Sequence, residues 1–145
     1  MTLADVSFWL ALCNSQHQFH RSAAEWFYHQ PEDGSVLFCR STQQSLLRLL
    51  TTQAVMHRYE GAPMTNAAAW RLYRDILGNR RCGYIQEPDG IDEWWERFAK
   101  HPSPSPKLWM DAYLAAFAVC GGLAFVTMDA GFRQFIGLKL IVLPR

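Results

Sequence analysis

Three aspartates stand where a divalent cation could bind. Asp5 and Asp129 each follow a short apolar run of the kind that forms buried strands. In open α/β sheets, ligands bind at the carboxyl ends of the strands, so these two carboxylates are expected to meet at one edge. Two carboxylates that meet there repel each other unless a proton or a cation lies between them. A hard divalent cation with oxygen ligands would satisfy both.

The third acid, Asp111, lies inside an apolar helix expected over residues 107–120. An ionised side chain in such a helix is costly unless it is paired or bound to a metal. The alternative is an i, i+4 ion pair with Lys107, although that order of charges is the weaker one against the helix dipole. Asp5 and Asp129, taken singly, could equally serve as turn or cap residues. The three acids together favour a metal site.

The elements that must position these acids follow from the pattern of apolar residues. Short apolar runs separated by amphipathic helices predict right-handed crossovers and a parallel sheet that is covered on both faces. A short extended piece is also expected to begin at Ile85. The predicted strands span residues 2–4, 36–39, 123–128 and 138–143, and the predicted helices lie over 8–12, 18–30, 41–50, 67–77, 91–100, 107–120 and a short turn at 131–136.

Composition limits the size and the class of the protein. The chain has 145 residues, of which 50% are hydrophobic and 19% charged, so we expect a single α/β domain over residues 1–145. The formal net charge of +1 excludes a polycation that coats nucleic acid, but it does not exclude a local basic face.

The cysteines, the N-terminus and the longest apolar stretch point to a soluble cytoplasmic protein. The four cysteines have no C-x-x-C spacing, which argues against a zinc ribbon and favours free thiols. The N-terminus has no basic region ahead of an apolar one, unlike a signal peptide. The longest apolar stretch, residues 110–126, is interrupted by Asp111 and a Gly-Gly pair and does not read as a membrane span.

Four segments, in this order, carry a family resemblance. They are the start Asp-Val-Ser at Asp5, the helix Thr42–Thr51, the helix Leu108–Ala118, and the strand and turn Phe125–Phe132. Together they resemble the PIN-domain ribonucleases of the VapC type, and the resemblance covers nearly the whole chain. It implies a PIN-like three-layer α/β/α sandwich with a central parallel sheet. It also implies a metal-dependent endoribonuclease, usually a toxin held by a VapB-like antitoxin.

The resemblance also implies roles for particular residues. Asp5, Asp111 and Asp129 would hold Mg²⁺ or Mn²⁺, which would activate a water for phosphodiester hydrolysis. The family's second acid, usually Glu, matches Gln43 here, and an amide brings an oxygen but no charge. We prefer Gln43 to Gln44 because Gln44 is expected to form a capping box with Ser41.

Further polar residues are expected around this site, each with a plain structural alternative. Ser7 and Thr127 could orient the carboxylates or a metal-bound water, or be ordinary turn and strand hydroxyls. Arg48 is expected near the site, and Glu87 could substitute for the missing acid or be an exposed loop residue. The pair Trp94–Trp95 could stack bases, or divide between core and interface.

Two other functions remain open from the sequence. A PIN fold that binds RNA or a partner but cleaves weakly would follow if Gln43 cannot replace the acid. A phosphatase or a receiver-like phosphoacceptor on another α/β fold is less favoured, because Ser7 stands where such a site wants a second acid. The expected partners are an RNA substrate, an antitoxin and a second copy of the chain, since the small size and aromatic content favour a homodimer.

Overall fold

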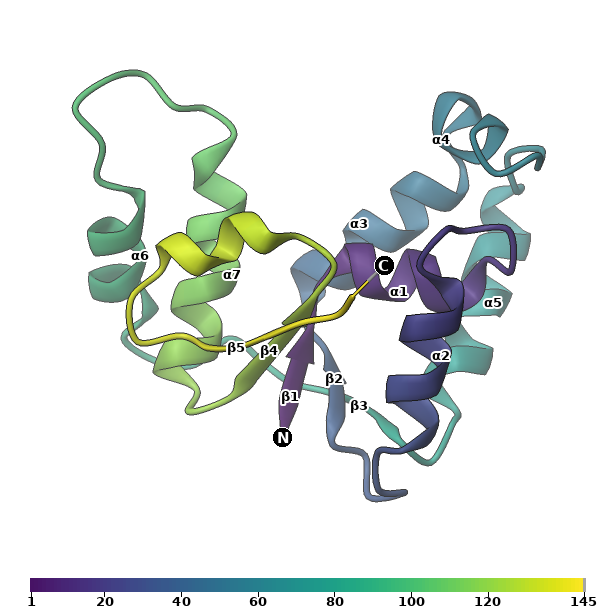
Figure 1. Ribbon diagram of the computed structural model, residues 1–145, viewed down its shortest axis with the longest axis horizontal. Coiled ribbons are helices and arrows are strands. Elements are labelled where there is room, and N and C mark those ends of the chain that lie inside the picture. The colour runs from purple at the N-terminus through teal and green to yellow at the C-terminus, as the bar shows by residue number, and fades with distance from the viewer. Residues whose placement is uncertain (145) are drawn as a thin grey trace.

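Five short strands form one parallel sheet at the centre of the molecule (Figure 1). The computed structural model describes residues 1–144. The strands stand in the order β3-β2-β1-β4-β5, and every neighbouring pair is parallel. Their bounds are β1 Thr2–Ala4, β2 Val36–Phe38, β3 Cys82–Tyr84, β4 Ala124–Thr127 and β5 Lys139–Val142.

The order of the strands creates a switch point at the centre of the sheet. The chain runs outward from β1 through β2 to β3, and then returns to place β4 on the other side of β1. Helices that leave β1 and β4 therefore diverge to opposite sides, which opens a crevice at the carboxyl ends of these two strands. The register aligns Ala4 with Val126, and the amide of Asp5 donates to the Val126 carbonyl at 2.9 Å.

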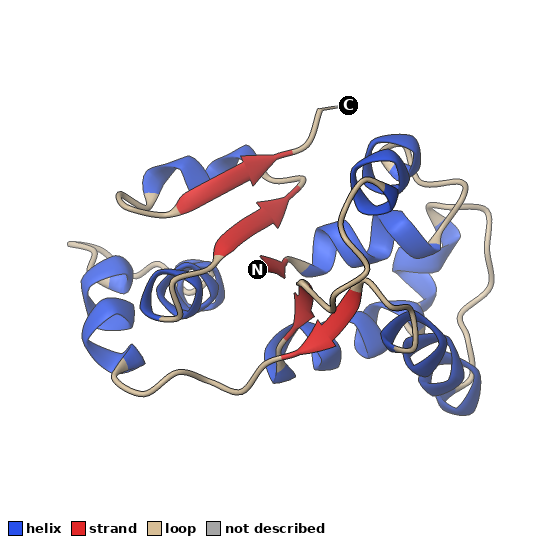
Figure 2. Ribbon diagram, turned by 90° about the horizontal axis from the view of Figure 1, so that it is seen from below, coloured by secondary structure: helices blue, strands red, loops and turns tan. Residues whose placement is uncertain are grey.

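Helices cover both faces of the sheet, and each face has its own core (Figures 1 and 2). Side chains alternate along the strands, so Leu37 and Phe125 enter one core while Phe38 and Val126 enter the other. One face is covered by α1 Val6–Cys13, α2 His20–Tyr28, α3 Arg40–Leu50, α4 Gln53–His57 and α5 Asn66–Leu77. The other is covered by α6 Ile91–Ala99, α7 Leu108–Cys120 and the 3₁₀ helix η1 Ala130–Gln134. The predicted parallel α/β/α sandwich is confirmed.

Aromatic packing fixes the first helix on the sheet. Trp9 is fully buried and stacks on Phe38 with ring centroids 3.8 Å apart. Its indole nitrogen donates to the Ala4 carbonyl at 3.1 Å, so the polar atom of this buried ring is satisfied. Because Ala4 precedes Asp5, this contact ties the packing of α1 to the residue that ends β1.

Several predicted helix starts are displaced. Helix α3 begins at Arg40, its N-cap is Cys39, and the capping box joins Cys39 to Thr42 rather than Ser41 to Gln44. The helix follows β2 almost at once, so Ser41 already lies in the first turn. Helix α5 also begins one residue earlier than expected, with Thr65 as its N-cap, whereas α7 begins one residue later than expected, with Lys107 as its N-cap.

Two segments differ from the expected elements. Strand β3 ends at Tyr84, just before the extended piece that was expected to begin at Ile85. The short helix α4 was not expected, because one turn and a half of helix carries too little periodicity to be recognised.

All four cysteines are free thiols, as predicted. No helix within residues 1–144 combines the length and the apolar character needed to cross a membrane.

Candidate active site

Asp5 lies at the carboxyl end of β1 and begins helix α1. It is buried, and its side chain accepts hydrogen bonds from the Val6 amide at 2.7 Å, from Ser7 Oγ at 2.5 Å and from Thr127 Oγ1 at 2.7 Å. Burial raises the pKa of Asp5 above its usual value, and these hydrogen bonds only partly offset it. A carboxylate has about four lone-pair positions, and these three hydrogen bonds leave one of them, on Oδ1 of Asp5, for a further ligand.

Ser7 and Thr127 form a polar clamp between β1 and β4. Besides donating to Asp5, Ser7 Oγ accepts from the Met128 amide at 3.2 Å and Thr127 Oγ1 accepts from the Asp129 amide at 3.0 Å. The two hydroxyls therefore join the carboxylate at the end of β1 to the backbone that carries the second acid.

Asp129 follows β4 and caps the helix η1. Its Oδ1 accepts from the Gly131 amide at 2.7 Å, and the residue is exposed to solvent. No hydrogen bond engages Oδ2 within residues 1–144. The cap role that sequence alone allowed is therefore real, and it leaves one carboxylate oxygen free.

Asp111 lies in the first turn of α7 and is half-buried. Burial raises the pKa of Asp111 to about 6, and the negative charges of Asp5 and Asp129 add to this effect. In the described part of the chain, Asp111 has no hydrogen bond or ion pair, so the alternative pair with Lys107 is not formed. The three acids thus act on one another electrostatically although they come from three separate elements.

The chemistry of this donor set fits a hard divalent cation. Three carboxylates that repel one another, each with a free oxygen lone pair, need positive charge to be fully ionised together. Within residues 1–144, no group of three His, Cys, Asp or Glu side chains stands close enough together to hold a metal ion. Mg²⁺ usually keeps several waters and takes only one or two carboxylates directly, so an ion at this edge would complete its coordination with water.

Gln43, the residue expected to match the family's second acid, is buried on α3, and its side chain is already hydrogen-bonded. Its Oε1 accepts from Arg40 Nη1 at 2.6 Å, and the Arg40 guanidinium also lies over the Tyr84 ring, 5.4 Å from its centroid. Arg40 was missed at the level of sequence. The signal that could have found it is the i, i+3 spacing to Gln43 in the first turn of a helix.

Arg48 and Glu87 do not join the three aspartates. Arg48 lines a separate hollow of about 340 Å³ between α3 and α5, beside Trp70. Glu87 is exposed, and its Oε2 accepts from the Tyr113 hydroxyl at 2.6 Å. This contact, together with burial, raises the pKa of Tyr113 above its usual value.

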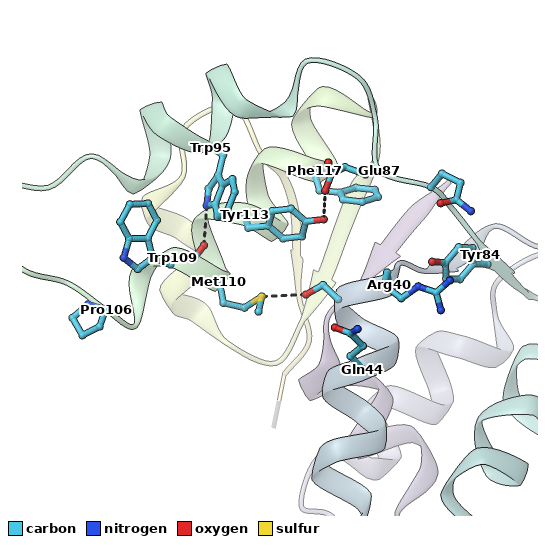
Figure 3. Close-up of a pocket in the computed structure, with 12 residues that line it drawn as sticks. Arg40, Gln44, Tyr84, Glu87, Trp95, Pro106, Trp109, Met110, Tyr113 and Phe117 are labelled. Atoms are coloured by element: carbon cyan, nitrogen blue, oxygen red, sulfur yellow. Dashed lines mark hydrogen bonds between the residues drawn. The ribbon is translucent and has the colours of Figure 1, made fainter. Parts of the chain in front are cut away.

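Trp94 and Trp95 divide between two environments. Trp94 packs on Phe98 beneath the Arg97 guanidinium, whereas Trp95 meets Trp109 and Tyr113 edge to face. Trp95 thereby lines a cleft of about 700 Å³ between α3 and α7, which also contains Arg40, Gln44 and Glu87 (Figure 3). We call this hollow the aromatic cleft. None of the three aspartates lines it, but its wall includes Met110, the neighbour of Asp111.

Comparison with known proteins identifies the family to which this fold belongs. The family model described as PIN domain matches residues 2–138. The chain is 46% identical over 146 residues to Ribonuclease VapC41 from two strains of Mycobacterium tuberculosis, CDC 1551 / Oshkosh and ATCC 25618 / H37Rv, with all of both chains covered.

Solved structures share the same fold. VapC20 of Mycobacterium tuberculosis, described as a Sarcin-Ricin loop cleaving toxin, has a TM-score of 0.65 at 19% identity and covers 99% of this chain and 100% of its own. VapBC2 from Rickettsia felis, bound to a DNA fragment from its promoter, has a TM-score of 0.63 at 11% identity, covering 99% and 98%. VapBC-1 from nontypeable Haemophilus influenzae has a TM-score of 0.65 at 12% identity, covering 97% and 96%.

These matches define the class of the protein as a PIN domain. The chain belongs to the VapC ribonucleases of the PIN-domain family, the toxins of toxin–antitoxin systems.

Proposed function

We propose that this VapC ribonuclease hydrolyses phosphodiester bonds within RNA at Asp5, Asp111 and Asp129, with Mg²⁺ or Mn²⁺ as its cofactor. The observation that carries the proposal is that Asp5 and Asp129 follow two neighbouring parallel strands and are joined through the hydroxyls of Ser7 and Thr127, with Asp111 near enough for their charges to act on it. A cluster of carboxylates that cannot all ionise without a counter-charge is suited to a divalent cation. Bound there, the ion would supply an activated water and would offset the charge that develops on the phosphate.

The residues of this chain have different roles in the proposed metal site. The Oδ1 atom of Asp5 and the free Oδ2 atom of Asp129 offer ligand positions at the ends of β1 and β4. Asp111 offers a third from across the crevice, on α7. Ser7 and Thr127 orient Asp5, which leaves its remaining lone pair in a fixed direction. Gln43 contributes a neutral oxygen whose direction is set by Arg40.

Substitution of the acids tests this proposal. Asp5→Asn, Asp111→Asn and Asp129→Asn should each lower the cleavage rate of a single-stranded RNA by about 100-fold or more, because each removes a charged ligand at similar volume. The measurement is the initial rate with Mg²⁺, with Mn²⁺ and with EDTA. EDTA should abolish wild-type cleavage, and Mn²⁺ should restore it.

A matched control is Glu93→Gln. Glu93 is an exposed acid in the first turn of α6. It forms a weak i, i+4 ion pair with Arg97 at 3.8 Å and is not one of the proposed ligands. This variant should cleave at the wild-type rate. Cleavage at full rate by the Asp5 and Asp111 variants, or by wild type in EDTA, would exclude the proposed site.

The proposed partners follow from the relatives. Two of the structural neighbours are described as VapBC complexes, which supports an antitoxin of the VapB kind for this chain. We further propose that the protein acts in the cytoplasm as a homodimer, and that residues 1–145 form a single domain. Size-exclusion chromatography with light scattering tests the dimer, and co-purification with the product of an adjacent reading frame tests the antitoxin.

A further inference from the structure

The aromatic cleft has one wall of exposed rings. Trp109 and Met110 on α7 are 58% and 50% exposed, although both are large and apolar. Trp95 donates its indole hydrogen to the Trp109 carbonyl at 3.0 Å and meets Trp109 and Tyr113 at interplanar angles of 86° and 72°. In an edge-to-face contact the edge of one ring covers a face of the other, but the exposure of Trp109 leaves part of its ring open to solvent. A flat ligand could therefore stack on this wall.

The opposite side of the cleft is polar and carries both signs of charge. Arg40 and Gln44 project from the first two turns of α3, and the Arg40 side chain points toward Tyr84, at the end of the cleft opposite Trp109 (Figure 3). The Arg40 guanidinium is exposed but held in place by Gln43 and by the Tyr84 ring. On the rim, the Tyr113 hydroxyl holds Glu87, which leaves Glu87 Oε1 without a hydrogen bond in the described chain.

The cleft lies beside the proposed catalytic edge, because Asp111 lines a neighbouring hollow that shares Pro106 with the cleft. Ser41 Oγ donates to Met110 Sδ at 3.1 Å across the space between α3 and α7, and Asp111 is the next residue along α7. Arg40 reaches from the cleft to Gln43, the position of the family's second acid. A chain that crosses the three aspartates would therefore meet the cleft within a short distance along its backbone.

We propose that the aromatic cleft binds a short unpaired stretch of the RNA substrate, with one base against Trp109 at one end, and with an amino group of another base on Glu87 and a phosphate on Arg40 at the other end (Figure 3). This inference rests on the proposed function, because the acids determine where the RNA lies. A nucleotide combines a flat apolar face, an N–H edge and an anionic phosphate. These three features match the rings, the held carboxylate and the held guanidinium, whereas an apolar protein helix would use the rings alone.

Trp109→Ala tests the stacking contact. Stacking of one base on an aromatic side chain is worth 1–3 kcal/mol, so this variant should raise the Kd for a labelled single-stranded RNA by about 5- to 100-fold. Binding is measured by fluorescence anisotropy in EDTA at fixed salt, with the integrity of the RNA checked on a gel. The matched control is Trp70→Ala, which removes a partly exposed tryptophan from α5, outside the cleft, and should leave the Kd unchanged.

Glu87→Gln tests the base contact. An acidic side chain accepts from the cytosine amino group, and a good base contact discriminates by 1–3 kcal/mol. Wild type should therefore bind oligocytidine about 5-fold or more tighter than oligouridine, and Glu87→Gln should reduce that ratio toward one. The Tyr113→Phe variant, which frees Glu87 while keeping the ring, should reduce the ratio less.

The outcomes separate this inference from the proposed function. If the acid variants lose cleavage but Trp109→Ala retains the wild-type Kd, the cleft is not an RNA subsite while the catalytic site stands. If Trp109→Ala converts a dimer to a monomer and leaves the Kd unchanged, the cleft holds a second copy of the chain, and the proposal is overturned. If wild type shows no preference for oligocytidine, the role of Glu87 is overturned. Circular dichroism of each variant verifies that it is folded.

Discussion

Asp5 is held more firmly than the other two acids. Its carboxylate takes three hydrogen bonds from α1 and β4, whereas Asp129 takes one and Asp111 takes none among the residues described. Burial nevertheless raises the pKa of Asp5. A carboxylate that is oriented but incompletely stabilised is a good ligand, because a cation supplies the charge compensation that the hydrogen bonds do not.

The pairing of Gln43 with Arg40 leads to a prediction at the residue scale. Gln43→Glu alone should raise the affinity for Mn²⁺ by only about 3-fold or less, because Arg40 would form an ion pair with the new carboxylate. The double variant Gln43→Glu/Arg40→Gln should bind Mn²⁺ more tightly than either single variant. Isothermal titration calorimetry without RNA measures this. Equal affinities in the single and double variants would show that Arg40 does not control this position.

At the scale of elements, the switch from β1 to β4 creates the catalytic edge. Both strands end at the same edge, and the amide of Asp5 is bound to the carbonyl of Val126. Helices α3 and α7 approach that edge from opposite faces of the sheet and carry Gln43 and Asp111. Strand β3, at the end of the sheet, leads the chain from Tyr84 toward Glu87 and so positions one side of the aromatic cleft.

Close packing at β3 can be tested with a single methyl group. A Cβ atom at Gly83 would lie 2.5 Å from the Gly34 carbonyl oxygen and 3.0 Å from Leu37 Cδ2. Gly83→Ala should therefore destabilise the protein by about 1–3 kcal/mol, because backbone atoms must move apart. The control, Gly61→Ala, places its nearest contact at 3.5 Å and should be close to neutral. Urea denaturation measures both, and equal midpoints would contradict the predicted clash.

At the scale of the whole molecule, the near-neutral charge conceals a separation of charges. Three of the 13 acidic residues are the proposed ligands, and the remaining ten stand against 14 basic residues. The two cores lie on opposite faces of one narrow sheet, so the acids occupy the place where the two halves of the molecule meet. The stability of the whole therefore depends on how the charges at that edge are compensated.

The dependence of stability on pH follows from Asp111. Its pKa of about 6 lies above the usual 3.8, so the folded state holds this proton more tightly than the unfolded state does. Asp111 therefore costs stability as the pH rises from about 4 through 6, and the full cost remains above that range. Without metal at pH 8, Asp111→Asn should be more stable than wild type by about 1 kcal/mol, after allowance for partial exposure.

Urea denaturation at two pH values checks this. The difference between Asp111→Asn and wild type should vanish below about pH 3, where Asp111 is protonated in both the folded and the unfolded state. Addition of Mg²⁺ at pH 8 should stabilise wild type more than the variant, because a ligand that binds the folded state raises its stability. A variant that is less stable than wild type at pH 8 in EDTA would mean that Asp111 is not electrostatically strained.

The sequence by itself determined the fold class, and it supplied the three acids that we propose as ligands. Apolar runs before Asp5 and Asp129, and an acid inside the apolar helix at Asp111, are local patterns that need no tertiary information. The helix starts were less accurate, because capping depends on where the preceding strand ends, and at α3 this moved the cap from Ser41 to Cys39. Because Gln44 is not part of the capping box, that reason for preferring Gln43 as the match to the family's second acid no longer holds. The preference itself stays a prediction: Gln43 is buried beside Arg40, whereas Gln44 lines the cleft.

Only the tertiary structure decided which side chains share a surface. The contact of Thr127 with Asp5 spans 122 residues, and that of Tyr113 with Glu87 spans 26. Tertiary structure also decided that Arg48 lies apart from the aspartates. It likewise formed the aromatic cleft, because the lining residues come from α3, α6, α7 and the segment after β3. Spacing along the chain predicts neighbours within one helix or strand, but contacts between elements depend on strand order and on the packing of helices across the sheet.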